Sequence, residues 1–270
     1  MTMRTYIHIK NQSPEHESGR IALQQALRQR DIEVVDDLQQ AEGVDFVISI
    51  GGDGTLLSAV HKIGDSGIPV VGINFGHLGF LTTAGREDID KLVDSLKEHR
   101  YTIEPRTMLE VKLYKQGQNE AIMTLSALNE VFLHRCDNSP LLHARVESDG
   151  DMVANYAADG LIVATPTGST AYSLSCGGPI LTPNSGCFAL TPIAAHTLTQ
   201  RPVILADTVS LRLSVEDSDV RFALGVDSTM LTLDGCHVVA IKKAPYCTQL
   251  IRIDHQNFFS AIRDKLMWGL

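Results

Sequence analysis

Residues with the chemistry of a reactive site gather first at Gly51-Gly52-Asp53-Gly54-Thr55. An apolar, β-branched run at 44–50 precedes them and an apolar run at 56–60 follows, so the pattern predicts a buried strand, a tight turn and a helix. In an open parallel sheet, ligands bind at the carboxyl ends of the strands, where a helix start offers backbone N–H groups to a phosphate. Asp53 is therefore a candidate for a phosphate-binding crevice. The competing interpretation is that it only caps the helix.

A second polar group begins at Asp159-Gly160 and continues, after an apolar strand, through residues 165–175. These read Thr-Pro-Thr-Gly-Ser-Thr-Ala-Tyr-Ser-Leu-Ser, which combines small hydroxyl donors with a tyrosine ring. Such a set suits a polar ligand that carries sugars and an aromatic base. The alternative is a turn rich in serine and threonine before a capped helix.

Asn129 and Glu130 stand side by side just before another apolar strand. Because adjacent strand residues point to opposite faces, both serve one ligand only at a strand end or a bulge. Taken alone, the pair favours a turn.

The first hundred residues predict the elements that would position Asp53. Short apolar runs at 6–10, 32–35, 44–50 and 69–74 predict strands, and the spacing of apolar residues predicts helices over 13–30 and 87–98. Strands that alternate with helices predict an α/β domain with a parallel sheet, here residues 1–100.

From residue 101 to about 250 the pattern changes to short strands separated by turns. The expected strands are at 108–115, 121–125, 131–134, 142–147, 203–205, 209–215, 220–226, 230–233 and 238–242. These runs predict a mostly β second domain over 101–250. The last segment, 251–270, is expected to form a C-terminal helix from His255 that packs back on the first domain or on a partner chain.

Composition limits the class of protein. Lys and Arg number 23 against 32 Asp and Glu, a formal charge of −9, which argues against binding nucleic acid through its phosphates. No apolar run approaches the roughly 20 residues needed to span a membrane, and the N-terminal residues lack the apolar core of a signal peptide. Five scattered cysteines without a Cys-x-x-Cys pair are expected to be reduced. We therefore expect a cytoplasmic protein with no membrane partner.

These segments occur in one order that resembles the bacterial NAD kinases. The resemblance is carried by residues 51–55, 74–81, 129–130, 159–173, 177–179 and 192–198. The Gly-Gly-Asp-Gly turn alone also occurs in lipid kinases and phosphofructokinases. Joined to Asn-Glu and to Thr-Pro-Thr-Gly-Ser-Thr-Ala-Tyr, it is strongly specific.

The resemblance implies transfer of a phosphoryl group from ATP, or from polyphosphate, to the 2′-hydroxyl of the adenosine ribose of NAD, which gives NADP. It also implies a homodimer or homotetramer. The chain has no Gly-x-x-x-x-Gly-Lys-[Ser/Thr] loop, so glycine N–H groups and a divalent ion are expected to hold the phosphates. We expect Mg²⁺ to arrive on the nucleotide, with no metal cage built by the protein.

The resemblance also implies roles for individual residues. Asp53 would be the general base, Gly54 would allow close approach of the substrate, and Phe80 would touch adenine. The residues expected to bind NAD are Asn129 and Glu130, Asp159 on the nicotinamide side, and Thr170, Ala171, Tyr172, Ser173 and Ser175 on the adenine side.

Two positions depart from the pattern of the relatives. Ala157 stands where bacterial relatives often carry arginine, and Thr229 falls near an expected glutamine. Both departures concern the discrimination among forms of NAD. The nearby pair Asp227-Ser228 is a further candidate ligand contact.

Two other functions compete with this one. A lipid kinase would need membrane contacts, whereas this chain is acidic and shows no basic amphipathic helix. A non-catalytic dinucleotide sensor is disfavoured by the intact Asp53, because a sensor needs no base there. Apolar residues near the C-terminus, Phe258, Phe259, Met267 and Trp268, suggest surface that a partner subunit covers.

Overall fold

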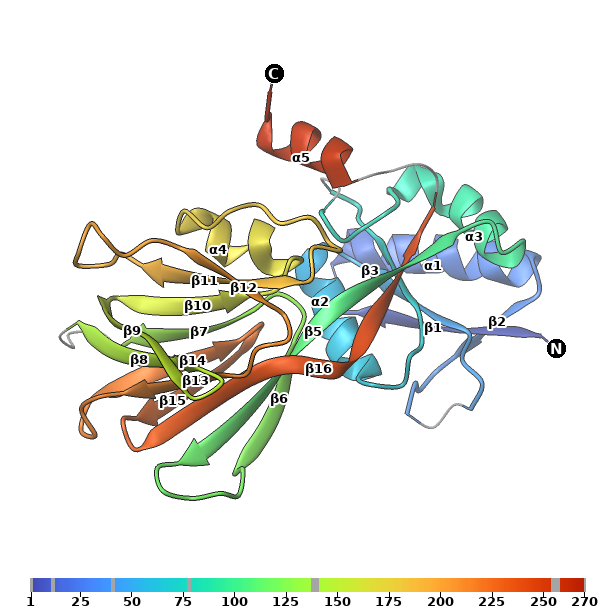
Figure 1. Cartoon of the computed structure of the whole chain (residues 1–270). Helices are drawn as coiled ribbons and strands as arrows, with labels where there is room; N and C mark the ends of the chain where they lie inside the picture. The colour runs from blue at the N-terminus through green and yellow to red at the C-terminus, as the bar shows by residue number, and fades with distance from the viewer. Residues whose placement is uncertain are drawn as a thin grey trace. The chain divides into compact units, whose positions relative to one another are not determined.

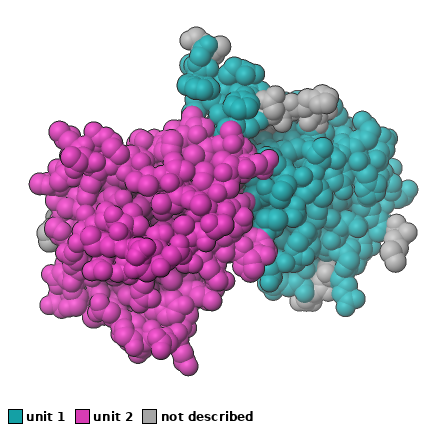
Figure 2. Space-filling model, viewed as in Figure 1, with its two compact units in different colours: residues 1–106, 247–270 teal, residues 107–246 magenta. Residues whose placement is uncertain are grey.

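A computed structural model describes residues 2–10, 13–39, 42–76, 79–136, 141–253 and 258–269. The chain divides into two compact units, shown in Figure 2. Unit 1 contains residues 1–106 and 247–270, and unit 2 contains residues 107–246. The division falls inside the strands β5 (Thr102–Lys115) and β16 (His237–Arg252), so each of these strands contributes residues to both units.

Unit 1 is built on a parallel sheet, as the alternation of strands and helices predicts (Figure 1). The strand order is β2 (Ile32–Val35), β1 (Met3–Ile9), β3 (Phe46–Ile50), β4 (Val70–Ile73) and the end of β16. The pairings β1–β2, β1–β3, β3–β4 and β4–β16 are all parallel. Every residue of β3 is buried, which is typical of a central parallel strand covered on both faces.

The helices of unit 1 are α1 (Pro14–Gln29), α2 (Asp53–Ile63), α3 (Ile89–Lys97) and α5 (Phe258–Leu266), with a 3₁₀ turn at Arg86–Asp88 before α3. The side chain of Ser13 caps α1 by accepting from the backbone N–H of His16, and Pro14 begins the helix. Leu27 of α1 and Leu92 of α3 pack in one core with alternate residues of β3, such as Ile48.

Unit 2 is mostly β, as expected. One antiparallel sheet has the order β12-β11-β10-β7-β14-β15, and antiparallel pairings also join β8 to β9 and to β13, β13 to β16, and β5 to β6. The remaining bounds are β6 (Met123–Ala127), β7 (Glu130–Arg135), β8 (Leu142–Ser148), β9 (Asp151–Ala158), β10 (Gly160–Ala164), β11 (Cys187–Ile193), β12 (Val203–Ala206), β13 (Leu211–Val215), β14 (Arg221–Val226) and β15 (Thr229–Asp234). A 3₁₀ turn at Gly168–Thr170 and the short helix α4 (Tyr172–Ser175) follow β10.

The core of unit 2 joins the two sets of strands. Leu133 of β7 and Leu161 of β10 pack in the same buried cluster as Val146 of β8 and Leu213 of β13. Alternate residues of β8 and β13 are buried and exposed, which is the pattern of strands with one face on a core. This packing places the start of β7 and the end of β10, where the polar segments lie, on a rigid support.

β9 and β11 were not among the predicted strands, and β5 and β16 are longer than predicted. β16 has 16 residues, and the run at 238–242 predicted only its first part, because Lys242, Lys243 and Pro245 interrupt the apolar pattern. β11 was not predicted, because Thr191 and Pro192 interrupt its apolar run after four residues. The C-terminal helix, expected from His255, begins at Phe258 in the part of the chain that the structure describes. None of the described helices is both long enough and apolar enough to cross a membrane.

Candidate functional site

Asp53 lies at the carboxyl end of β3, where the sequence pattern predicts it. Gly51 has a φ of +140°, and a Cβ there would lie 2.4 Å from the Thr55 hydroxyl, so the turn requires glycine. Asp53 is the first residue of α2 and Gly52 is its N-cap, so no side chain caps this helix. The interpretation of Asp53 as a helix cap is therefore wrong.

The carboxylate of Asp53 binds a loop that is distant in the sequence. Its Oδ2 accepts from the backbone N–H of Phe80 at 2.8 Å, and its Oδ1 accepts from Leu81 at 3.1 Å and Thr82 at 3.3 Å. A carboxylate offers about four acceptor positions. The described residues use three of them and leave one on Oδ2. Asp53 is thus held rigidly and still retains one position for a hydroxyl donor.

Gly79 allows this contact. A Cβ at Gly79 would lie 1.7 Å from Oδ1 of Asp53, so no other residue fits without moving the carboxylate or the loop. The Gly79 N–H donates to the Thr82 hydroxyl at 2.6 Å, which closes the turn. The next residue, Phe80, is half-buried, and Lys265 of α5 lies 5.6 Å from the centre of its ring. His77 and Leu78, also part of the family pattern, lie outside the described residues.

In unit 2, Asn129 and Glu130 lie at the start of β7, where a strand end lets both side chains serve one ligand. Asp227 fixes the backbone at this point. Its Oδ2 accepts from the Leu128 N–H at 2.7 Å, and its Oδ1 accepts from Asn129 at 2.9 Å and Glu130 at 3.0 Å. Asp227 sits in the two-residue turn between β14 and β15 with a φ of +47°, a conformation that aspartate tolerates better than most residues. The Asp227 carboxylate therefore fixes the backbone of Asn129 and Glu130. The neighbouring Ser228 is exposed.

Glu130 is 8% exposed, and its Oε2 has no hydrogen-bond partner among the described residues. The N–H of Tyr172 donates to this carboxyl group. Burial, followed by the negative charge of Asp227, raises the pKa of Glu130 to about 8. A buried carboxyl with an unused oxygen costs stability unless a ligand pairs with it, so Glu130 is a strong candidate for ligand binding.

The segment that begins at Thr165 packs directly on the Asn-Glu pair. The Thr165 hydroxyl donates to the Leu128 carbonyl, and its N–H donates to the Asn129 carbonyl at 2.9 Å. A Cβ at Gly168 would lie 2.1 Å from the same Asn129 oxygen, so this close approach needs glycine. The two motifs, read as separate in the sequence, are one structure.

The other residues expected to bind the adenine side lie close to this point but differ in exposure. Tyr172 is half-buried, with its ring edge-on to Phe132 at 5.5 Å. Ser173 is fully buried, and its hydroxyl shares a 2.9 Å hydrogen bond with Thr191. Thr170 donates to the Thr167 carbonyl at 3.3 Å, Ala171 is half-buried and Ser175 is exposed. In this structure Ser173 supports the turn, whereas Tyr172 and Ser175 remain accessible.

Asp159 pairs with an arginine that the sequence analysis missed. Nε of Arg135 on β7 donates to Oδ1 of Asp159 at 2.6 Å, and both side chains are about one-third exposed. Arg135 thus supplies a guanidinium beside the Asp-Gly segment, in a chain that has Ala157 two residues before Asp159. Residues from neighbouring antiparallel strands meet in this way, but their pairing is not visible in the sequence.

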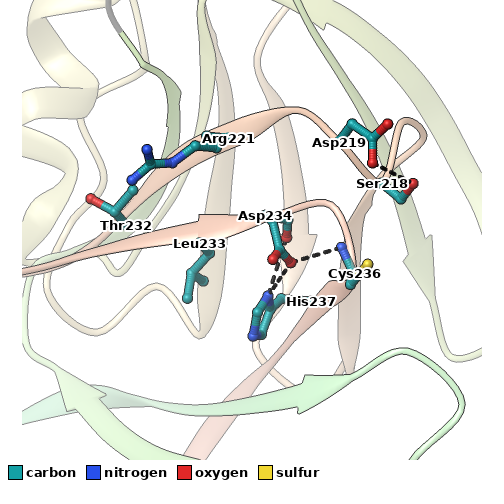
Figure 3. A pocket seen from close by; sticks show the side chains of 8 residues that line it. All are labelled: Ser218, Asp219, Arg221, Thr232, Leu233, Asp234, Cys236 and His237. Atoms are coloured by element: carbon teal, nitrogen blue, oxygen red, sulfur yellow. Dashed lines mark hydrogen bonds and ion pairs between the residues drawn. The ribbon is translucent and has the colours of Figure 1, made fainter.

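A surface hollow of about 500 Å³ lies elsewhere in unit 2 (Figure 3). It is lined by Ser218, Asp219, Arg221, Thr232, Leu233, Asp234, Cys236 and His237. Asp234 and His237 pair at 2.7 Å within it, and this hydrogen bond lowers the pKa of Asp234. Arg221 and Asp234 form the last pair of the β14–β15 hairpin, about 20 Å along the strand from Asp227 in the turn. None of the expected site residues lines this hollow.

The first prediction concerns Gly79. Because an alanine Cβ would collide with the Asp53 carboxylate, Gly79→Ala is expected to lower the free energy of unfolding by about 1–3 kcal/mol. Amide hydrogen exchange of Phe80, Leu81 and Thr82 is expected to accelerate. Gly76→Ala is the matched control, since a Cβ there meets only Asn74 at 3.8 Å. Unchanged exchange in Gly79→Ala would contradict the steric account.

The second prediction concerns Glu130. Its pKa is raised from 4.5 to about 8 in the folded protein, so the folded state keeps a proton that the unfolded chain has lost between these pH values. The free energy of unfolding is therefore expected to fall as pH rises through this window, by at most about 1.4 kcal/mol per pH unit from this group.

Glu130→Gln removes the titration and is expected to be more stable than the parent at pH 8, measured by urea unfolding from pH 5 to 8. The exposed Glu33→Gln serves as control. A slope that survives in Glu130→Gln would assign the pH dependence to another group.

Comparison with known proteins identifies the family. Residues 1–101 match the family model of the ATP-NAD kinase N-terminal domain, and residues 128–253 match that of the C-terminal domain. An NAD kinase from Flavobacterium psychrophilum is 40% identical over 226 residues, which cover 83% of this chain and 76% of the relative.

Two solved structures are also similar. A yeast NADH kinase complexed with NADH has a TM-score of 0.90 at 24% identity and covers 99% of this chain and 88% of its own, a likeness of fold. An NAD kinase from Archaeoglobus fulgidus in complex with ATP has a TM-score of 0.77 at 26% identity and covers 98% of this chain and 99% of its own. With both family models matched in order and a relative 40% identical over most of its length, this chain belongs to the ATP-NAD kinase family.

Proposed function

We propose that this protein phosphorylates the 2′-hydroxyl of the adenosine ribose of NAD with ATP as donor and so makes NADP. Membership of the ATP-NAD kinase family gives the reaction class. The observation on this chain that supports it best is Asp53, a carboxylate that follows the end of a parallel strand. Backbone N–H groups occupy three of its acceptor positions, and no described residue occupies the fourth. ATP as donor is supported by the archaeal NAD kinase in complex with ATP.

Each group has a defined part in this reaction. Phosphoryl transfer depends on positioning and on electrostatic stabilisation, with a carboxylate that orients the hydroxyl and takes its proton. The remaining acceptor position of Asp53 suits that task, and the backbone contacts keep the carboxylate from rotating. Glu130 and Asn129 would hold NAD, where the unpaired Oε2 of Glu130 gains a hydroxyl partner.

Magnesium is part of the proposal. No three His, Cys, Asp or Glu side chains gather as a metal site in the described part of the chain. Mg²⁺ is commonly held by one or two carboxylates together with substrate phosphates, so the available donors fit an ion that arrives with the nucleotide. When bound, it would neutralise charge on the phosphate oxygens.

The reaction is tested by a coupled assay of NADP formed from NAD, with ATP or polyphosphate as donor, with and without a chelator. We expect NADP formation with ATP and Mg²⁺, and loss of activity on chelation. Tight NAD binding without any NADP would instead identify a dinucleotide sensor.

The role of Asp53 is tested by Asp53→Asn. The substitution removes the basicity and puts an amide N–H₂ where backbone N–H groups need an acceptor, so it disturbs both the chemistry and the loop. General bases contribute about 10²–10⁴-fold, so kcat is expected to fall by at least about 10²-fold. Calorimetric NAD affinity is expected to stay within about tenfold of the parent.

Gly79→Ala is the matched control for this experiment, because it disturbs the contact between Asp53 and the loop but keeps a carboxylate at residue 53. It is expected to lose about tenfold in kcat. Equal losses of kcat in the two variants would mean that Asp53 only anchors the loop.

We also propose that the protein is a homo-oligomer. Phe259 is 54% exposed, Met267 76% and Trp268 60%, so the end of the chain presents apolar side chains to solvent. Strand β12 adds Ile204, 45% exposed, on the edge of its sheet. Light scattering at micromolar concentration is expected to give a dimer or tetramer, and a fully active monomer would refute this.

A cytoplasmic location completes the proposal. The five cysteines are all free thiols in the structure, and free thiols are typical of reducing compartments.

A further inference from the structure

The loop that binds Asp53 is also held from its other side, by Arg252 at the end of β16. Its Nη2 donates to the Phe80 carbonyl at 3.1 Å, and its Nη1 donates to the Leu81 carbonyl at 3.2 Å and to the Thr83 hydroxyl at 3.4 Å. The arginine side chain is 13% exposed. Asp53 accepts from the N–H groups of the same two residues, Phe80 and Leu81.

Two successive residues are therefore bound through both of their backbone polar groups. Their N–H groups donate to a carboxylate and their carbonyls accept from a guanidinium, so each contact is assisted by a charge. The planar fork of arginine donates to two carbonyls at once, which the single ammonium of lysine cannot do in a fixed geometry. Rotation of these residues would break a contact on each side. Arg252 thus limits the movement of the loop and, through it, of Asp53.

Glu104 fixes Arg252 in turn. Its Oε2 accepts from Nε of Arg252 at 2.9 Å and from Nη2 of Arg106 at 2.9 Å. Burial raises the pKa of Glu104, but the charges and hydrogen bonds of Arg106 and Arg252 outweigh burial and keep the pKa below its usual value. The carboxylate is therefore ionised at neutral pH and holds the guanidinium in one orientation.

We propose that Arg252, oriented by Glu104, is a positioning residue for phosphoryl transfer, acting on Asp53 through the Phe80 and Leu81 backbone. This inference rests on the proposed function. The competing role is purely structural, in which the arginine only ties the end of β16 to the loop. The two differ in whether kcat of the folded enzyme depends on Arg252.

The first experiment measures kcat, the KM for NAD and the calorimetric NAD affinity of Arg252→Ala, at a temperature well below its unfolding midpoint. Misplacement of a reacting group by about 1 Å costs up to about 10²-fold, so we expect kcat to fall tenfold to a hundredfold. The NAD affinity is expected to stay within about threefold of the parent. Arg30→Ala is the matched control, because Arg30 pairs with Asp90 at 2.9 Å and Asp94 at 2.7 Å in the same unit. It is expected to keep the parent kcat.

Guanidinium at millimolar concentration provides a rescue that a structural role would not give. The free ion can occupy the space left by Arg252→Ala and donate to the two carbonyls and to Glu104. We expect it to recover at least about threefold in kcat for this variant and nothing for Arg30→Ala, while sodium chloride at equal ionic strength recovers nothing. If Arg252→Ala does not fold, Arg252→Lys takes its place in the kcat and exchange measurements, with an expected fall of about threefold to tenfold.

Amide hydrogen exchange of Phe80, Leu81 and Thr82 measures how often the loop opens, independently of catalysis. We expect faster exchange in Arg252→Ala or Arg252→Lys, and parent rates in Arg30→Ala. A parent protein that makes no NADP would refute the proposed function. The exchange rates would still show whether Arg252 restrains the loop. Parent kcat in a folded Arg252 variant, or a lost kcat with unchanged exchange in this loop, would overturn the inference.

Discussion

A carboxylate that accepts three consecutive backbone N–H groups organises one polar segment in each of the two units, and the candidate residues of each unit depend on it. Asp53 binds the N–H groups of residues 80–82 in unit 1, and Asp227 binds those of residues 128–130 in unit 2. Each contact brings a turn to a segment far away in the chain and fixes its backbone. Hydrogen bonds to a charged acceptor are stronger than neutral ones, typically about 1.5–3 kcal/mol each, so the segments are held without a regular element of their own. The two carboxylates differ in one respect: the described residues leave one acceptor position of Asp53 unused, while the negative charge of Asp227 raises the pKa of Glu130.

The burial of Glu130 beside Asp227 lowers the stability of the fold. A buried carboxyl beside a second negative charge is held in its neutral form near pH 7, and one of its oxygens has no partner among the described residues. A packed apolar side chain at this place would stabilise the fold more. The position is better explained by a ligand that supplies the missing hydrogen bond, and such a loss of stability is frequent at functional sites. Thr165 and Gly168 pack on the backbone of Asn129, the residue before Glu130.

Local patterns in the sequence predict much of this structure. The alternation of strands and helices predicts the parallel sheet of unit 1, and the buried run before Gly51 predicts the strand that presents Asp53. The partners of these residues are not predictable in this way. Arg252 lies 171 residues from Leu81 along the chain, and in the sequence it stands between Ile251 and Ile253, outside every predicted strand. Gly79 is required because of a carboxylate on another element, and Arg135 meets Asp159 only because β7 pairs with β10. Sequence spacing carries no record of such contacts.

The central claim is that Asp53 takes part in the chemistry and does not only anchor a loop. A double-mutant cycle with Asp53→Asn and Gly79→Ala tests it most directly, because both substitutions disturb the same loop contact and only one removes the base. The account predicts that Asp53→Asn still lowers kcat by at least about tenfold in the Gly79→Ala background. If the two single variants and the double variant share one kcat, Asp53 acts only through the loop and the claim is wrong.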